Sequence, residues 1–266
     1  MSRPILVFDS GLGGTTVLAA IATRLPDTRF VYLADDAGFP YGAWTDEAGL
    51  VARIVDLVTA EAAASDACCA VIACNTAATV ALPALRAALD IPVVGTVPAI
   101  KPAAERSRSG LASVLATPAT VARDYTRELI RAHGGDVRFT LIGAAPLATL
   151  AEAHAAGAPV DSNEIARIVA PCFVEDGDRR TDVVVLACTH YPLLSDLLPR
   201  IAPWPVDWID PAPAIARRVA AVLDVPETDE RAPDTVDIAA RFTSGRARAP
   251  EIAPLVDHRI RALATR

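Results

Sequence analysis

Several features that this chain of 266 residues lacks already limit what it does. It has no surplus of basic charge, because its formal net charge is −7 and proteins that bind nucleic acids usually carry a basic face. It has no long apolar run either. The apolar stretch before Asp9 is only four residues long, too short for the core of a signal peptide, and nothing later approaches a membrane span. We therefore expect neither a nucleic-acid partner nor a membrane segment.

Cysteine is also scarce, and none of it is spaced for metal binding. Two of the five cysteines are adjacent in sequence, and no pair has the spacing of a zinc site, so no metal is expected. Without an export signal, an odd number of cysteines is typical of free thiols in a reducing, cytoplasmic compartment. The five are Cys68, Cys69, Cys74, Cys172 and Cys188.

The remaining pattern alternates β-branched apolar runs with alanine-rich amphipathic stretches, which indicates βαβ units and parallel sheets. The predicted strands are Ile5–Phe8, Arg29–Ala34, Ala70–Ala73, Val93–Gly95, Ser113–Ala116, Arg138–Ile142, Asp182–Ala187 and Val206–Ile209. The predicted helices lie near 15–24, 46–65, 77–89, 99–108, 119–133, 162–175 and 192–201, with another at Pro213–Leu223. Eight strands are compatible with one large sheet, a barrel or two smaller sheets.

Two cysteines occupy matching contexts in the two halves of the chain. Cys74 and Cys188 each follow an apolar run that predicts a buried strand, and each is followed by small polar residues where a helix should begin. The repetition favours two similar half-structures, with a break near residues 95–98. Side chains at the carboxyl ends of parallel strands point into the crevice where such sheets bind ligands. Two thiols facing one ligand could take a proton from one side of a carbon and return it to the other.

Polar neighbours strengthen this interpretation. Asn75, Thr76 and Thr189 would place donors near helix N-termini, which favour a carboxylate, and His190 could assist proton movement beside Cys188. The alternative is that each cysteine is simply packed in the core, as most buried cysteines are. The other three cysteines lack such neighbours and are assigned to packing or surface.

Two further turns are candidate binding segments. Phe8–Gly14 follows the first strand, and its Asp9 could hold an ammonium group, although a capping turn explains the segment equally well. Its glycine spacing fits neither a dinucleotide-binding turn nor a phosphate loop. The second turn is Phe39–Gly42, whose backbone amides and tyrosine hydroxyl could meet a carboxylate; an ordinary proline-initiated turn is the alternative.

Taken together, the motifs resemble those of the glutamate racemases, in the aspartate/glutamate racemase family. They run in order over about four fifths of the chain: Phe8-Asp9-Ser10-Gly11-Leu12-Gly13-Gly14, Ala34-Asp35 with Pro40-Tyr41-Gly42, Ala73-Cys74-Asn75-Thr76-Ala77, Gly95 with Val97-Pro98-Ala99, Thr117-Pro118-Ala119-Thr120-Val121, Cys188-Thr189-His190-Tyr191-Pro192 and Ile209-Asp210-Pro211. The resemblance implies a cofactor-independent isomerase that makes D-glutamate for peptidoglycan. It also implies an α/β fold of two pseudo-symmetric parallel-sheet domains with the active site in the cleft between them. We assign residues 1–97 plus 208–266 to the Cys74 domain and 98–207 to the Cys188 domain.

The resemblance also implies roles for individual residues. Cys74 would deprotonate D-glutamate and Cys188 L-glutamate, with Asp9, His190 and Glu152 tuning or relaying protons. The substrate-binding residues would be Asp9, Ser10, Pro40, Tyr41, Gly42, Asn75, Thr76, Thr117, Thr120, Thr189 and His190. One segment departs from the family pattern: the family's active-site glutamate ends a stretch containing cysteine and proline, whereas Ala145–Glu152 here has no cysteine.

Other functions remain open from the sequence. A racemase of aspartate or a related acid would share the two thiols. A phosphatase using Asp9 as nucleophile normally has a second aspartate two residues on, where Gly11 stands. A non-catalytic amino-acid-binding protein could retain the same residues. Members of the racemase family are often dimers, so the resemblance allows a homodimer.

Overall fold

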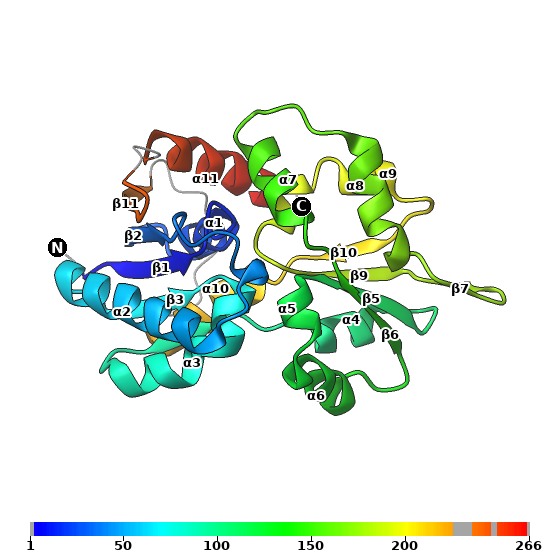
Figure 1. Ribbon diagram of the computed structural model, residues 1–266, viewed down its shortest axis with the longest axis horizontal. Coiled ribbons are helices and arrows are strands. Elements are labelled where there is room, and N and C mark those ends of the chain that lie inside the picture. Colours follow the sequence, from blue (N-terminus) through cyan, green and yellow to red (C-terminus); the bar gives the residue numbers. More distant parts are fainter. Residues whose placement is uncertain (1–2, 226–235, 246–248, 265–266) are drawn as a thin grey trace. The chain divides into compact units, whose positions relative to one another are not determined.

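The computed structural model describes residues 3–225, 236–245 and 249–264. The chain forms two compact units (Figure 1). Unit 1 contains the residues up to Thr96 and those from Ala212 onward, and unit 2 runs from Val97 to Pro211. The second boundary differs from the predicted one after residue 207. Strand β10 (Asp207–Ile209) pairs with β9 (Val183–Ala187), so its hydrogen bonds hold it in unit 2.

Unit 1 is built on a five-stranded sheet in the order β11-β2-β1-β3-β4, in which every pair is parallel. Its strands are β1 (Ile5–Asp9), β2 (Arg29–Ala34), β3 (Cys69–Ile72), β4 (Val93–Gly95) and β11 (Asp237–Phe242). The edge strand β11 comes from the far end of the chain and pairs with β2 from Asp237 opposite Arg29 to Phe242 opposite Ala34. The C-terminal segment therefore completes the first sheet.

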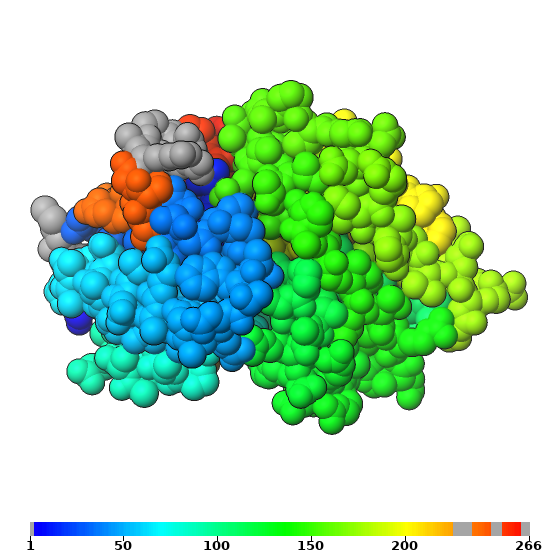
Figure 2. Space-filling model, in the orientation of Figure 1, coloured from blue at the N-terminus to red at the C-terminus, as the bar shows by residue number. Residues whose placement is uncertain are grey.

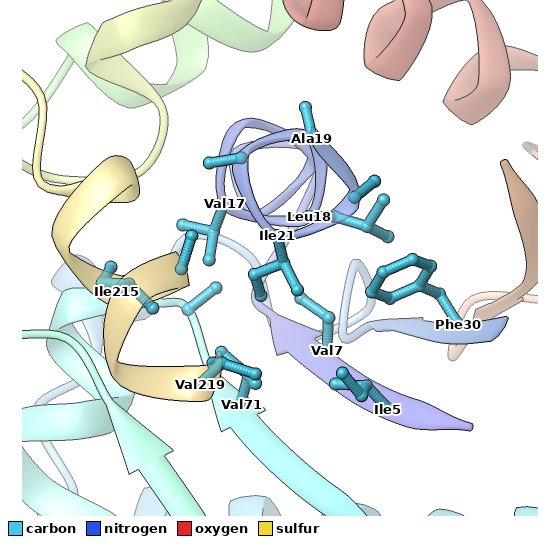
Figure 3. Packing of buried hydrophobic residues seen from close by; sticks show 14 of the residues in the cluster. Ile5, Val7, Val17, Leu18, Ala19, Ile21, Phe30, Val71, Ile215 and Val219 are labelled. Carbon is cyan, nitrogen blue, oxygen red and sulfur yellow. The ribbon is translucent and has the colours of Figure 1, made fainter. Parts of the chain in front are cut away.

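Helices cover both faces of this sheet. They are α1 (Thr15–Arg24), α2 (Glu47–Ser65), α3 (Asn75–Ala88), α10 (Ala212–Val222) and α11 (Ala249–Ala264), with a 3-10 turn η1 (Tyr41–Ala43). Side chains alternate along β1, so Ile5 and Val7 pack with α1, α10 and α11, whereas Leu6 and Phe8 pack with α2 and α3. Figure 3 shows Ile5 and Val7 below Ile21 of α1. In Figure 2 the light-blue atoms of α2 form much of the visible surface of unit 1.

Unit 2 contains a four-stranded parallel sheet in the order β10-β9-β5-β6. Besides β9 and β10, its strands are β5 (Leu111–Ala116) and β6 (Arg138–Gly143); a short antiparallel hairpin is formed by β7 (Glu175–Asp176) and β8 (Arg179–Arg180). Its helices are α4 (Ile100–Arg106), α5 (Pro118–Val121), α6 (Asp124–His133), α7 (Leu147–Ala155), α8 (Ser162–Val169) and α9 (Leu198–Ile201), with 3-10 turns η2 (Ala170–Cys172) and η3 (Tyr191–Leu194). In Figure 1, α4 and α6 lie on one side of the sheet and α7 and α8 on the other.

The two sheets share one strand order. In unit 1 the first strand, β1, lies between the second, β2, and the third, β3, and β4 follows β3. In unit 2, β5 lies between β6 and β9, and β10 follows β9. The predicted fold class of two similar parallel-sheet α/β domains is thus confirmed. Each of the eight predicted strands matches an observed strand to within two residues at either end.

The helix predictions were less accurate where proline intervenes. The predicted helix 162–175 ends at Val169, and the predicted helix 192–201 is replaced by η3 and α9. Pro171 and Pro199 lack the N–H that a continuing helix needs, and the proline ring clashes with the carbonyl four residues earlier. The predicted helix 119–133 is two helices, α5 and α6, and the hydroxyl of Thr126 donates to the carbonyl of Thr120 across the break.

Helices α7 and α11 and the β7–β8 hairpin are not among the elements that the sequence predicts. Helix α7 had a usable signal, because Pro146 precedes nine residues made mostly of alanine and leucine, which are strong helix formers. The tail from 226 to 254 was predicted to be irregular, with a short strand near Arg241; the strand is β11, whereas residues 226–235 and 246–248 lie outside the described part of the chain. Within the described ranges, no helix is long and apolar enough to cross a membrane.

Candidate active site

Cys74 and Cys188 follow the strands that occupy the same place in the two sheets. Cys74 lies two residues after β3, and Cys188 lies directly after β9. Both thiols are almost completely buried, with 6% of each residue exposed. Phe8 pairs with Ile72 and Ala116 with Ala187, so continuing the registers sets Ser10 opposite Cys74 and Thr117 opposite Cys188. Each cysteine thus has a hydroxyl residue on the adjacent strand end of its own unit.

In unit 1 this hydroxyl lies close to the thiol. The Ser10 Oγ and Cys74 Sγ atoms are 3.7 Å apart, within the range of a hydrogen bond to sulfur. Asp9, at the tip of β1, is fully buried, and its Oδ1 accepts a hydrogen bond of 2.9 Å from the Gly11 amide. The Tyr32 hydroxyl donates to the Gly11 carbonyl at 2.6 Å, which fixes the turn from the neighbouring strand. Tyr32 was not singled out from the sequence.

Gly14 allows this turn to pack tightly against Asp9. A Cβ added at Gly14 would lie 2.6 Å from the Asp9 Cβ, closer than real Cβ contacts come, and 3.0 Å from the Tyr32 hydroxyl oxygen. The backbone of Gly14 has an ordinary helical conformation, with φ of −62°. Glycine is therefore needed here for space rather than for its freedom in φ.

Asn75 and Thr76 begin helix α3, with Cys74 as its N-cap, as the sequence predicts. Asn75 is 2% exposed, and its Oδ1 lies 3.5 Å from the Thr96 hydroxyl. Its Nδ2 is buried with no hydrogen-bond partner among the described residues. Burying an amide donor without a partner costs about 1–3 kcal/mol, so this donor favours an acceptor that a ligand would supply.

The turn at Pro40-Tyr41-Gly42 offers a ligand its backbone but not its tyrosine hydroxyl. Of the two groups that the sequence suggests could meet a carboxylate, the Tyr41 hydroxyl donates instead to Asp35 Oδ2 at 2.6 Å. Its side chain is buried and packs in the same apolar cluster as Cys74. Burial, the hydrogen bond to Asp35 and the negative charge of Asp35 raise the pKa of Tyr41 far above its usual range, so it stays protonated. Only the backbone of this turn remains as the candidate binding group.

In unit 2 the thiol adjoins an imidazole and a carboxylate. The Cys188 Sγ lies 3.9 Å from His190 Nδ1, and the Thr189 hydroxyl lies 3.5 Å from the same nitrogen. The other ring nitrogen, His190 Nε2, lies 3.5 Å from Glu152 Oε1. Helix α7 packs against η3 to bring Glu152 to this place. The structure thus groups three of the predicted catalytic residues of unit 2: Cys188, His190 and Glu152.

The predicted residues Thr117 and Thr120 form the start of helix α5. Thr117 Oγ1 accepts from the Thr120 amide at 3.2 Å, and the two hydroxyl oxygens are 3.1 Å apart. The Tyr191 hydroxyl donates to the carbonyls of Ala116 and Ala144, at 3.0 and 3.1 Å, and so ties the ends of β5 and β6 together beside Thr117. Tyr191 was part of a recognised motif but had no assigned role.

The other three cysteines have different surroundings from Cys74 and Cys188. Cys69 and Cys172 are fully buried, and this burial raises the pKa of each thiol to about 12. Cys68 is half-buried, and burial raises the pKa of its thiol as well. These three thiols are poor candidates for proton transfer near neutral pH because they stay protonated.

The chain is similar over most of its length to known proteins. The chain is 56% identical to glutamate racemase of Brucella anthropi over 238 residues, which is 89% of this chain and 85% of that protein. It is also 56% identical to glutamate racemase of Brucella ovis over 243 residues, covering 91% of this chain and 87% of that protein.

Solved structures of glutamate racemases also resemble this chain. The Escherichia coli glutamate racemase, determined with L-glutamate and the activator UDP-MurNAc-Ala, superimposes with a TM-score of 0.84 and is 39% identical, covering 97% of this chain and 96% of that one. The RacE1 isoform from Bacillus anthracis gives a TM-score of 0.72 at 25% identity, covering 99% and 94%. The sequence profile of the Asp/Glu/Hydantoin racemases matches residues 9–219. With a family profile that spans most of its length and relatives of this similarity, the chain belongs to the Asp/Glu/Hydantoin racemase family.

Proposed function

We propose that this chain interconverts L- and D-glutamate by proton transfer between two cysteines, without an organic cofactor, and so supplies D-glutamate for peptidoglycan. The observation that carries the proposal is the placement of Cys74 and Cys188 after equivalent strands of two similarly ordered sheets. The 56% identity to proteins named glutamate racemase supports glutamate as the substrate.

The reaction balances with these groups alone. One cysteine, as its thiolate, takes the α-proton, and the electron pair of the C–H bond remains on the α-carbon next to the carboxylate. The other cysteine, as its thiol, gives its proton to the opposite side of that carbon and becomes the thiolate. The product is the mirror-image amino acid, and the two cysteines have exchanged protonation states. Cys74 acts as the base on D-glutamate and Cys188 as the base on L-glutamate.

Unit 1 contributes binding groups as well as a base. Asp9 holds the substrate ammonium group, and Ser10, close to the Cys74 sulfur, donates to its thiolate. The buried Nδ2 of Asn75 donates to the α-carboxylate, where negative charge grows as the proton leaves. Thr76 assists at the same end of α3, and the backbone of Pro40-Tyr41-Gly42 binds the side-chain carboxylate.

Unit 2 contributes the second base and the groups that tune it. His190 moves a proton to or from Cys188, and Glu152 orients the imidazole through its other nitrogen. The order thiol, imidazole, carboxylate resembles the arrangement by which other enzymes activate a weakly acidic nucleophile. Thr117, Thr120 and Thr189 add hydroxyl donors for the substrate. A homodimer and a cytoplasmic location stay predictions from the sequence.

The test is proton NMR of the purified protein with L-glutamate in heavy water and no added cofactor. Loss of the α-proton signal together with formation of D-glutamate, identified by chiral chromatography, is the expected result. Exchange with aspartate but not with glutamate would keep the two-cysteine chemistry and change the substrate. Absence of exchange with both amino acids would overturn the proposed reaction.

A further inference from the structure

A buried carboxylate beside the Tyr41 turn has no part in the proton transfers described above. Asp35 follows β2 and is fully buried, yet it is surrounded by donors from three separate parts of unit 1. Its Oδ2 accepts from the Tyr41 hydroxyl and from Arg53 Nε, each at 2.6 Å. Its Oδ1 accepts from Arg53 Nη2 and from the Thr243 hydroxyl, also at 2.6 Å each.

These donors make Asp35 an ionised anchor. Burial alone would raise the pKa of Asp35, but the hydrogen bonds from Arg53, Thr243 and Tyr41 outweigh burial, and the pKa is lowered from its usual value of 3.8. The Arg53 guanidinium donates a hydrogen bond to each carboxylate oxygen and its positive charge offsets theirs, so the carboxylate remains ionised at neutral pH. Hydrogen bonds to an ionised group are about twice as strong as those between neutral groups.

The C-terminal segment is part of this anchor. Thr243 follows directly after β11; its Oγ1 also accepts from the Ala37 amide at 3.1 Å, and its own amide donates to the Ala34 carbonyl at 3.1 Å. The neighbouring Ser244 donates from its amide and hydroxyl to Asp36. The loop after β2 is thus held by residues more than two hundred positions later in the chain.

The atoms around Asp35 are closely packed, and Gly38 leaves no room for a side chain. A Cβ added at Gly38 would lie 2.5 Å from Asp35 Oδ2, 3.0 Å from Tyr41 Cε1 and 3.1 Å from Arg53 Nε. The Gly38 carbonyl accepts from the Trp44 indole at 2.7 Å, and the Gly38 amide donates to the Asp35 carbonyl at 3.0 Å. The Tyr41 carbonyl accepts from the Trp44 amide at 3.3 Å, so Tyr41 is held at its backbone end as well as at its hydroxyl end.

We propose that Asp35 is a positioning residue for substrate, through which Thr243 of the C-terminal segment and Arg53 of α2 hold the Pro40-Tyr41-Gly42 turn where it binds the side-chain carboxylate of glutamate. The inference rests on the proposed function of that turn. A binding group that is held in advance loses little freedom when substrate arrives, which lowers the substrate concentration needed. The anchor acts on affinity for glutamate and not on the thiols.

A matched pair of variants at Thr243 tests this proposal. Thr243→Val removes the donor to Asp35 and the acceptor for Ala37 with little change in shape, and Thr243→Ser keeps both. We expect the KM for L-glutamate to rise about tenfold in the valine variant, the scale of one hydrogen bond to a charged group. Turnover should stay within about threefold of wild type, and the serine variant should resemble wild type in both constants.

A second measurement reports binding without turnover. Iodoacetamide is small and alkylates thiolates, so the rate at which it inactivates the enzyme reports on Cys74 and Cys188, and bound glutamate should slow the inactivation. In Thr243→Val, the glutamate concentration that halves the inactivation rate should rise by the same factor as KM. The inactivation rate without glutamate should be unchanged. Gly38→Ala, which alters no charge, should shift the same two constants in the same direction, with circular dichroism and the thermal midpoint checking that each variant is folded.

The outcomes separate this proposal from the one on which it depends. If wild-type protein exchanges glutamate but the valine and serine variants have equal KM values, the positioning role of Asp35 is wrong and the racemase proposal stands. A loss of turnover with unchanged KM in Thr243→Val would also overturn it. Both proposals would be overturned if glutamate did not protect the wild-type protein from iodoacetamide and its α-proton did not exchange with solvent.

Discussion

Replacing Cys74 by serine tests the two-cysteine reaction most directly, since it changes the acidity of one group and little else. The Cys74 thiol is buried and 3.7 Å from the Ser10 hydroxyl, so a serine hydroxyl at the same place could still form a hydrogen bond to it. The Cys188 thiol, 3.9 Å from His190, would be untouched. The variant should therefore fold normally and lose only one of its two bases.

The size of the effect follows from the acidities. An unperturbed thiol with a pKa near 8.5 costs about 2 kcal/mol to ionise at pH 7. A hydroxyl with a pKa near that of water, about 15.7, costs about 10 kcal/mol more. The serine alkoxide is a stronger base than the thiolate, so about half of this added cost is offset by easier removal of the α-proton. The barrier therefore rises by about 5 kcal/mol. Racemisation should slow by about 10³ to 10⁴ in both directions.

A substrate with a leaving group distinguishes the two cysteines, because elimination needs only one base. With 3-chloroglutamate, a base takes the α-proton, the C–H electron pair forms a double bond, and chloride departs with the C–Cl pair. Cys74→Ser should eliminate chloride only from the L-enantiomer and Cys188→Ser only from the D-enantiomer, measured by chloride release. Racemisation of glutamate by Cys74→Ser within tenfold of wild type, or equal elimination from both enantiomers, would refute the reasoning.

Other predictions concern the groups around the thiols. Asp9→Asn should mainly lower kcat, because the substrate ammonium group loses its charged partner; an unchanged kcat would remove Asp9 from the mechanism. Gly14→Ala places a methyl group 2.6 Å from the Asp9 Cβ and should lower kcat at least tenfold in the same assay. Asn75→Ala removes the buried amide donor and should lower kcat/KM for glutamate about tenfold to a hundredfold, in contrast to an unchanged kcat/KM if the amide is only structural. Because the pKa of Asp35 is lowered on folding, its contribution to stability is present above about pH 4 and lost as the pH falls through the folded value. The free energy of unfolding, measured with urea between pH 5 and about pH 2, should therefore fall less steeply with decreasing pH in Asp35→Asn than in wild type. Equal slopes would contradict this account.

Local patterns in the sequence were enough to define the strands and the two thiols. A buried parallel strand needs a short β-branched run, and such a run requires no knowledge of its partners, which is why the strands leading to Cys74 and Cys188 could be predicted. The resemblance of the surrounding motifs then gave the family. Helix ends were less predictable, because Pro171 and Pro199 interrupt stretches whose periodicity alone favours a longer helix.

Only the tertiary structure decided which side chains meet. From the sequence the Tyr41 hydroxyl could have met a ligand, but it donates to Asp35, whose carboxylate also accepts hydrogen bonds from Arg53 and Thr243. Thr243 lies 208 positions from Asp35, and contacts over such distances leave no periodic signal in a single sequence. The order of strands in each sheet was likewise beyond sequence, because any parallel strand can pair with any other in the same local geometry. The sequence by itself determined the strands of the two parallel sheets and the two candidate cysteines, whereas long-range hydrogen bonding and packing decided how each cysteine and the Pro40-Tyr41-Gly42 turn are held.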